Sequence, residues 1–284
     1  MLVKKEDILE LKKLAAHIRY DAIMAIKNVG QGHIGGSLSI ADLLAVLYGK
    51  QLRYKSEDPN WDDRDWVVLS KGHAGPALYS ALAIKGFFKE DTLLTLNNGG
   101  TSLPSHPDRL KTPGVDVTTG SLGQGTSQAA GVATGLKMSE KSSYVYLIVG
   151  DGELNEGQCW EAFQYIASNK LDNLILIIDE NKKQLDGDTK DIINPFDIEA
   201  KVRSFGFTTL KVKGGDINSI DAAIDYLKAI KNTAKCIILD SIKGAGVPLF
   251  AEMDNNHSVK FNNAELNKKT DLELERLKKV YAGE

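Results

Sequence analysis

The chain has 284 residues, which is long enough to bury a large core without disulfides or a structural metal. Lys and Arg number 35 against 38 Asp and Glu, and this net charge of −3 disfavours a protein that binds nucleic acid through its phosphates. No stretch approaches the roughly 20 apolar residues of a membrane span. The cysteines, Cys159 and Cys236, lack metal-type spacing. We therefore expect a cytoplasmic protein whose partners include neither nucleic acid nor a membrane.

The first third of the chain predicts helices separated by glycine-rich and polar segments. Apolar residues at three- and four-residue spacing predict a helix over 6–28, and the glycines of 30–36 end it. Ser39 is expected to cap a second helix that runs to about residue 48. A short buried strand is predicted at 67–69, with a helix from about 76. The proline- and glycine-rich segment 97–120 predicts a long ordered or functional loop.

The remainder of the chain alternates between strands and helices. The sequence predicts strands at 144–149, 174–178, 208–212 and 236–239, and helices at 126–138, 155–167, 218–231 and 263–281. Strands that are apolar on both faces are typical of an α/β fold in which helices cover both faces of a parallel sheet. No repeat or linker is evident, so residues 1–284 are expected to form a single domain with helical extensions at both ends.

Two of the predicted strands end in oxygen-bearing side chains. Gly150-Asp151-Gly152-Glu153 follows the strand 144–149, and Asn181 follows the strand 174–178. If these strands are neighbours, Asp151 and Asn181 offer two hard oxygen ligands, and a backbone carbonyl just beyond, at Lys183, offers a third. Mg²⁺, with Ca²⁺ or Mn²⁺ as substitutes, binds in this way when the phosphates of a diphosphate cofactor complete its shell. A turn that merely uses Gly and Asp is the alternative.

The spacing from Gly-Asp-Gly to Asn resembles the thiamine diphosphate-binding motif. Other segments, spread over nearly the whole sequence, resemble in the same order the N-terminal half of transketolase: GHIGGSLSIADLLAVLY, DPNWDDRDWVVLSKGHAGPALYSALA, LPSHPD, TTGSLGQGTSQAAGVATGLK, GDGELNEGQCWEAF and NLILIIDENKKQLDG. The resemblance implies the thiamine diphosphate-binding fold, with thiamine diphosphate and Mg²⁺ as cofactors.

The resemblance also implies roles for four of the five histidines. His73 and His257 would contact the diphosphate, and His257 would help to organise the active site. His33 and His106 would face the hydroxyls and the carbonyl of the substrate. Ser258 follows His257 where the family often has Gly. His17 lies in the first predicted helix and is expected to be structural.

Further cofactor contacts follow from the same resemblance. Gly120, Leu122 and Gly123 resemble the loop that lies against the cofactor, and residues 150–153 (Gly150, Asp151, Gly152 and Glu153) resemble the diphosphate-binding turn. Acidic residues at Glu156 and Glu161 would join a carboxylate network that faces the partner subunit. An exposed helix face is the alternative explanation for that pair.

Nothing in the sequence matches the second domain of transketolases, which carries the glutamate that activates the cofactor. We therefore expect the N-terminal subunit of a split transketolase. It would move a two-carbon ketol unit between phosphorylated sugars, in a dimer of heterodimers with a C-terminal pyrimidine-domain subunit, and be inactive alone. Open alternatives are a split enzyme for a deoxy, branched or sulfonated sugar, a 1-deoxyxylulose-5-phosphate synthase, and a non-catalytic thiamine diphosphate-binding subunit.

Overall fold

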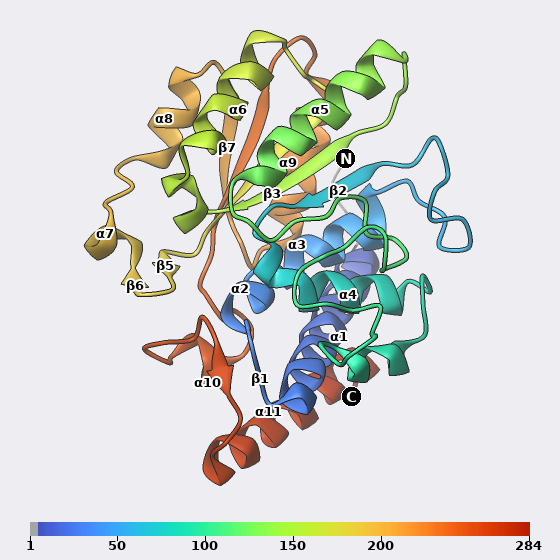
Figure 1. Ribbon diagram of the computed structural model, residues 1–284, viewed down its shortest axis with the longest axis vertical. Helices are drawn as coiled ribbons and strands as arrows, with labels where there is room; N and C mark the ends of the chain where they lie inside the picture. The colour runs from blue at the N-terminus through green and yellow to red at the C-terminus, as the bar shows by residue number, and fades with distance from the viewer. Residues whose placement is uncertain (1–4) are drawn as a thin grey trace.

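A five-stranded parallel sheet forms the centre of the molecule (Figure 1). The computed structural model describes residues 5–284. The strands lie in the order β2 (Trp66–Leu69), β3 (Val145–Gly150), β4 (Leu174–Glu180), β8 (Lys235–Asp240) and β7 (Thr208–Lys213). All neighbouring pairs are parallel. The structure also confirms each of the five predicted strands, whose ends shift by two residues at most.

Both faces of the sheet are buried because apolar side chains alternate between them. On β3, Tyr146 and Ile148 belong to one core, whereas Leu147 and Val149 belong to the other. Such two-sided burial requires helices on both faces. The predicted fold class, a parallel sheet covered by helices on both sides, is confirmed.

The helices divide between these two cores. The first core is covered by α1 (Lys5–Val29), α2 (Gly35–Leu38), α3 (Ala41–Val46), α4 (Gly75–Ile84), α9 (Ile217–Ala229) and α11 (Ala264–Ala282). The second is covered by α5 (Gln124–Met138), α6 (Gly157–Ser168) and α8 (Ile198–Ser204). Sequence patterns predicted most of these helices but not α8.

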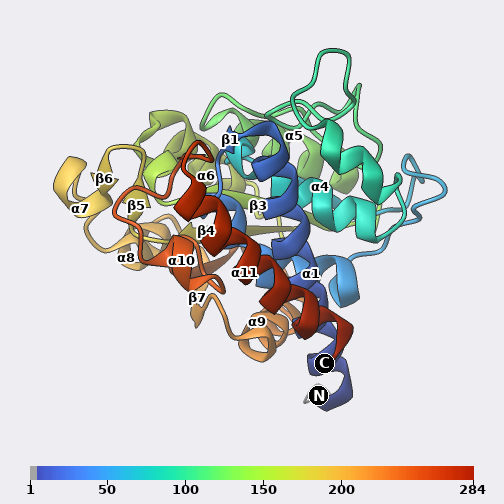
Figure 2. The same ribbon diagram turned by 90° about the horizontal axis from the view of Figure 1, so that it is seen from below.

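The first and last helices pack against each other. Figure 2 shows α11 crossing α1, and Lys27 of α1 forms an ion pair with Asp271 of α11. The side chain of Asn263 caps α11 by accepting from the backbone N–H groups of Glu265 and Leu266. Within residues 5–284, no helix combines the length and the apolar character that crossing a bilayer requires.

The role expected for Ser39 is wrong. The predicted second helix is divided into α2 and α3, followed by the π-helical turn η1 (Leu47–Gln51), and Ile40 precedes α3 without a side-chain cap. The Ser39 hydroxyl instead donates to Oδ2 of Asp179 at 2.7 Å. Leaving the buried Asp179 carboxylate without donors would cost more free energy than leaving a helix end without a side-chain cap, because an unpaired buried charge is very costly.

Short elements that sequence patterns did not predict shape the edges of the fold. They are the 3₁₀ helices η2 (Gly72–Ala74), η3 (Glu90–Thr95) and η4 (Gly152–Asn155), the helices α7 (Thr189–Ile192) and α10 (Pro248–Ala251), and the ribbons β1 (Gln31–Gly32) with β9 (Val259–Lys260) and β5 (Lys183–Gln184) with β6 (Gly187–Asp188). Because η4 precedes α6, the helix predicted from about residue 155 begins at Gly157.

The long segment 97–120 is an ordered loop that is anchored to the sheet. Leu103 and Thr112 are buried within it. The Thr119 hydroxyl donates to the carbonyl of Leu69 at 2.7 Å, at the end of β2, and the Thr119 N–H donates to Pro107 at 3.0 Å. These bonds hold Thr119 and Pro107, and with them the adjacent His106, at the carboxyl edge of the sheet.

Candidate functional site

The tips of β3 and β4 meet as the sequence predicted. Gly150 pairs with Asp179 in the parallel register, so Asp151 and Asn181 follow neighbouring strand ends. The backbone N–H of Asp151 donates to the carbonyl of Asp179 at 3.2 Å. The carboxylate of Asp151 accepts from the N–H of Gly152 at 2.8 Å and from that of Lys182 at 2.6 Å. The two predicted metal ligands therefore lie side by side.

Asp151 is a buried carboxylate that lacks a hydrogen bond from any cationic side chain among the described residues. It is 3% exposed, and its hydrogen bonds come from backbone N–H groups. Burial, with a smaller effect of the Asp179 carboxylate, raises the pKa of Asp151 to about 7. A divalent cation would remove this penalty, since an opposite charge favours the ionised form. Together with the amide oxygen of Asn181, this hard-oxygen donor set fits Mg²⁺.

The third predicted ligand, the carbonyl of Lys183, is in contact with a cation. Nζ of Lys243 donates to this carbonyl at 3.0 Å and lies 2.9 Å from Nδ1 of His257. Lys243 is only 3% exposed. Burial, followed by repulsion from Lys71, lowers the pKa of Lys243 to about 8. The carbonyl thus already accepts from an ammonium group, with which a bound metal ion would share it.

A second buried network lies beneath these ligands. Nζ of Lys71, 1% exposed, donates to Oδ2 of Asp179 at 2.6 Å and to the carbonyl of Gly36 at 2.8 Å. The hydroxyls of Ser39 and Ser241 also donate to Asp179. Burial alone would raise the pKa of Asp179, but Lys71 and these hydroxyls hold it below its ordinary value. This network joins β4 to the loops that follow α2, β2 and β8.

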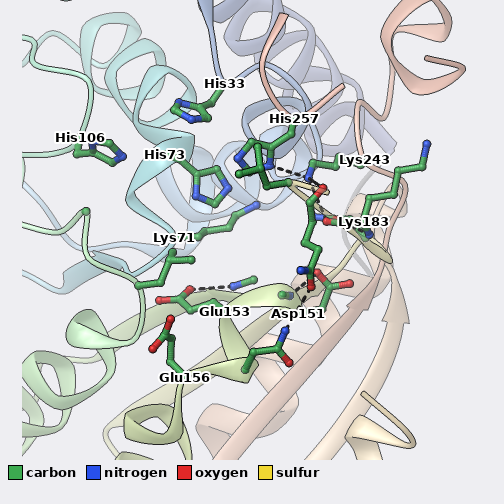
Figure 3. A pocket seen from close by; sticks show the side chains of 18 residues that line it. His33, Lys71, His73, His106, Asp151, Glu153, Glu156, Lys183, Lys243 and His257 are labelled. Carbon is green, nitrogen blue, oxygen red and sulfur yellow. Dashed lines mark hydrogen bonds between the residues drawn. The ribbon is translucent and has the colours of Figure 1, made fainter. Parts of the chain in front are cut away.

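Four histidines surround the open side of the site, as Figure 3 shows. The ring of His33 lies 5.2 Å from that of His257, 5.6 Å from that of His73 and 6.0 Å from that of His106. The rings of His73 and His257 are 5.0 Å apart. The residues come from three loops and from η2, so the fold brings together all four histidines that the sequence singled out.

The site favours the neutral form of all four imidazoles. Burial lowers the pKa of each of them, and in His257, with help from Lys243, it reaches about 3. Burial and Lys71 place the pKa of His73 well below its ordinary value. A neutral imidazole has one N–H donor and one acceptor. The cluster can therefore donate to anionic or hydroxyl oxygens and can also accept a proton.

Two glycines let the backbone approach the site closely. Gly120 has a φ of +152°, and a Cβ there would lie 3.2 Å from Cβ of His106. Gly123 has a φ of +83° and donates its N–H to Glu153 at 2.8 Å. Glu153, 2% exposed, also accepts from the Ser70 hydroxyl and from the N–H of Gly150. The Glu153 carboxylate therefore acts as a clamp, since it joins the end of β2 at Ser70, the loop at Gly123 and the end of β3 at Gly150.

The site residues line one cavity of about 400 Å³, called here the cofactor cavity. It is lined by all four clustered histidines and by Lys71, Gly120, Leu122, Gly150, Asp151, Gly152, Glu153, Asn155, Glu156, Asn181, Lys183, Gln184, Leu185 and Lys243. Gly123 lies behind Glu153, outside this lining. Glu161 is exposed on α6 and does not line the cavity, whereas Glu156 does.

Sequence reasoning missed two cations in this cavity. Lys71 lies two residues before His73, in a segment whose resemblance pointed to the histidine alone, and Lys243 follows β8. The strand-end argument that selected Asp151 applies equally to the end of β8, which adjoins β4. A lysine three residues beyond a buried strand is the signal that would have indicated Lys243.

The family follows from comparison with known proteins. The description "Transketolase, thiamine diphosphate binding domain" matches residues 11–276. The chain belongs to the transketolase family. The transketolase fold is also shared in three dimensions: transketolase from Campylobacter jejuni superposes with a TM-score of 0.85 at 27% identity, over 96% of this chain and 46% of that one. Residues 11–276, which include all residues that line the cavity, therefore correspond to the thiamine diphosphate-binding domain of that family.

Two kinds of relative differ in how much of their length the chain covers. The 6-deoxy-6-sulfo-D-fructose transketolase subunit of Clostridium sp. strain MSTE9 is 42% identical over 95% of this chain and 98% of its own length. An apulose-4-phosphate transketolase subunit of Actinobacillus succinogenes is 39% identical, over 84% and 86%. Human transketolase is 37% identical over 87% of this chain but only 39% of its own. The chain thus matches subunits almost end to end.

Proposed function

We propose that the chain is the N-terminal subunit of a split transketolase. It would transfer a two-carbon ketol unit from a ketose to an aldose, together with a second chain that carries the pyrimidine-binding half. The observation that carries this proposal is the cofactor cavity, in which cation ligands, neutral imidazoles and buried ammonium groups converge. The near-complete coverage of subunit-type relatives supports the division into two chains.

In this proposal Asp151, Asn181 and the carbonyl of Lys183 hold Mg²⁺, for which Ca²⁺ or Mn²⁺ could substitute. Thiamine diphosphate, when bound, supplies the nucleophilic carbon that breaks and remakes a carbon–carbon bond of the sugar. The chain's own contribution is to bind and orient the diphosphate. Lys243 adds positive charge beside the cation ligands, and Gly120, Leu122 and residues 150–153 form the surrounding walls, clamped by Glu153.

The histidines divide between the two ends of the cavity. His73 and His257, which lie next to Lys71 and Lys243, are proposed to donate to the diphosphate. His33 and His106 form the other side of the cluster and are proposed to contact the sugar hydroxyls and to move protons at the reacting carbonyl. Their neutral state suits both tasks, since one ring nitrogen can donate while the other accepts.

The assembly we propose is a dimer of heterodimers, in which two copies of this chain and two partner subunits form two active sites. Glu156 lies at the rim of the cofactor cavity and Glu161 lies further along α6, exposed. Exposed carboxylates at the mouth of a site are placed to meet a neighbouring subunit. Closed two-fold assemblies are the commonest arrangement of such subunits.

The donor sugar is the part of the proposal that the relatives bear on most directly. An ordinary phosphorylated ketose is one candidate. A deoxy, branched or sulfonated sugar is the second, because both subunit-type relatives carry names of unusual substrates. Contacts to the distal end of the sugar would come largely from the partner subunit. The choice therefore requires a substrate panel.

The experiment is a reconstitution. The chain and the product of the neighbouring reading frame are purified separately, and ketol transfer is measured for each alone and for the mixture, with ordinary phosphorylated ketoses and with deoxy, branched and sulfonated ketoses as donors. Activity in the mixture alone supports the split enzyme, and the preferred donor decides between the two substrate classes. Cofactor binding without transfer by any mixture would favour the non-catalytic alternative. Full activity of this chain alone would contradict the proposal.

A further inference from the structure

A second cluster of ligating side chains lies outside the cofactor cavity, between α1 and η3. Nε2 of His17 lies 3.6 Å from Oδ2 of Asp21 and 3.4 Å from Oε2 of Glu90. His17 and Asp21 are four residues apart on α1, so both side chains project from one face of the helix. All three ligand atoms lie within 4.8 Å of one another.

Asp21 is aimed into this cluster without a hydrogen-bond partner. Its side chain is 9% exposed, and among the described residues Oδ2 accepts no hydrogen bond. A buried carboxylate oxygen that accepts no hydrogen bond is expensive to retain, so its presence opposite an imidazole and a second carboxylate points to a positively charged ligand.

The distances suit a small tetrahedral cation. Zinc binds nitrogen and oxygen at about 2.0–2.1 Å, which places neighbouring ligand atoms of a tetrahedron about 3.3–3.4 Å apart. The observed separations of 3.4 and 3.6 Å are close to that value. An imidazole ligand favours zinc over magnesium or calcium, which prefer oxygen alone.

We propose that His17, Asp21 and Glu90 form a zinc site in which water completes the coordination. The ring of His17 is already held in place, because it stacks on Tyr281 of α11 with centroids 4.3 Å apart and an interplanar angle of 15°. Zinc would therefore join α1 to η3, with α11 supporting the imidazole. The site is independent of the cofactor and of the proposed reaction.

The location suggests what the metal would stabilise. η3 leads into the loop 97–120, which carries His106 to the cofactor cavity. α1 also contacts η3 through the side-chain amide of Asn28, which donates to the carbonyl of Leu94 at 2.7 Å. A metal bond to Glu90 would anchor the beginning of η3 and would thereby hold the segment that leads into the loop 97–120.

The test uses the full chain after treatment with a chelator. Zinc binding is measured by calorimetry for the wild type and for His17→Gln and Glu90→Gln, with Glu10→Gln as a control on the same helix. The wild type and the control should bind one zinc ion more than the ligand variants, or bind it at least about tenfold more tightly. Because the histidines of the cofactor cavity could also bind zinc, the difference between variants is the decisive quantity. Equal stoichiometry and affinity in all four proteins would overturn the site.

A second variant separates binding from folding. Asp21→Asn keeps the shape of the side chain and removes the buried charge, so the metal-free variant should unfold at a higher temperature than the metal-free wild type. It should also lose the zinc-dependent rise in unfolding temperature that the wild type and Glu10→Gln show. An equal rise in Asp21→Asn and the wild type would contradict the proposal, whether or not the chain supports ketol transfer.

Discussion

The ammonium group of Lys243 lies 2.9 Å from Nδ1 of His257, and both side chains line the cofactor cavity. An ammonium group can only donate, so Nδ1 is the acceptor in this pair and the imidazole proton resides on Nε2. Lys243 therefore fixes the tautomer of His257 and, after burial, contributes to lowering the pKa of His257 to about 3. Lys243 therefore keeps His257 neutral, with its Nε2–H available as a donor beside the predicted cation ligands.

Replacing Lys243 should weaken cofactor binding and remove a pH dependence. The pKa of Lys243 is about 8, so its charge, and with it the affinity for a diphosphate, should fall as the pH rises from about 7 to 9. Lys243→Met should bind thiamine diphosphate at least about tenfold more weakly, with a flatter pH profile. Calorimetry with the partner present measures both effects. Lys182→Met, which removes an exposed ammonium paired with Asp240, is the control and should behave as the wild type. An unchanged profile in Lys243→Met would contradict this role.

Removing the carboxylate of Asp151 should abolish Mg²⁺-dependent cofactor binding. The carboxylate is the only charged group of the three proposed ligands, and Asn181 and a carbonyl alone hold a divalent ion poorly. Asp151→Ala is compared with the wild type by calorimetry, at saturating Mg²⁺ and with the partner present. Unchanged cofactor affinity would refute the assignment.

When no metal is present, the Asp151 carboxylate should lower the stability of the folded chain, although it supports cofactor binding when Mg²⁺ is present. The pKa of Asp151 is raised from 3.8 to about 7 in the folded chain, so between these values the native state binds more protons than the unfolded state. Native stability therefore falls as the pH rises through this window and stays low above it. Asp151→Asn removes this effect.

The metal-free Asp151→Asn variant should accordingly unfold at a higher temperature than the metal-free wild type at pH 8. The gap should shrink toward pH 4. Each kcal/mol shifts the midpoint by roughly 2–4 °C in a protein of this size. Thermal unfolding of both proteins in chelator, at several pH values, measures the gap. A gap that is constant with pH would mean that Asp151 is ionised in the folded chain throughout.

His106→Ala should leave cofactor binding largely intact and lower turnover by one to two orders of magnitude, roughly the lower range for losing a proton-handling group. His106 lies on the side of the cluster away from Lys243, at a ring distance of 6.0 Å from His33. Ser105→Ala, which changes the neighbouring residue of the same loop, is the control. Affinity and turnover of the reconstituted complex are measured separately. Lost affinity with normal turnover per bound cofactor would reverse the assignment.

Glu153→Gln should destabilise the chain although it changes few atoms. The carboxylate accepts from Ser70, Gly123 and Gly150, and an amide offers one oxygen in place of two. An unsatisfied buried donor costs about 1–3 kcal/mol. Urea unfolding should show a loss of this order, whereas Glu161→Gln, on the exposed face of α6, should show almost none. Equal losses in the two variants would argue against the clamp.

Sequence patterns predicted those parts of the site that depend on strand ends. Buried strands can be recognised from their apolar residues, and parallel strands bring their carboxyl ends to one edge, so Asp151 and Asn181 could be placed together in advance. The five strands and most of the covering helices follow from the same reasoning.

Other features depend on contacts between distant segments, which local patterns do not encode. Ser39 has the character of a helix cap, but a carboxylate 140 residues away takes its hydroxyl. Lys71 pairs with that same Asp179 across 108 residues. The cluster of His17 and Asp21 is local, yet its third member, Glu90, comes from η3. In each case the partner, rather than the residue, decides the role.

The order of strands in the sheet has a consequence for how the chain folds. β8 lies between β4 and β7, yet it follows both in the chain. Until residues 235–240 leave the ribosome, β4 and β7 cannot be joined, and each presents an unpaired edge that is open to association with other chains. The loop with Lys243 and His257 comes later still. The chain must therefore be synthesised at least as far as residue 257 before the complete cavity can form, and chains truncated before residue 235 should aggregate rather than persist as partly active fragments.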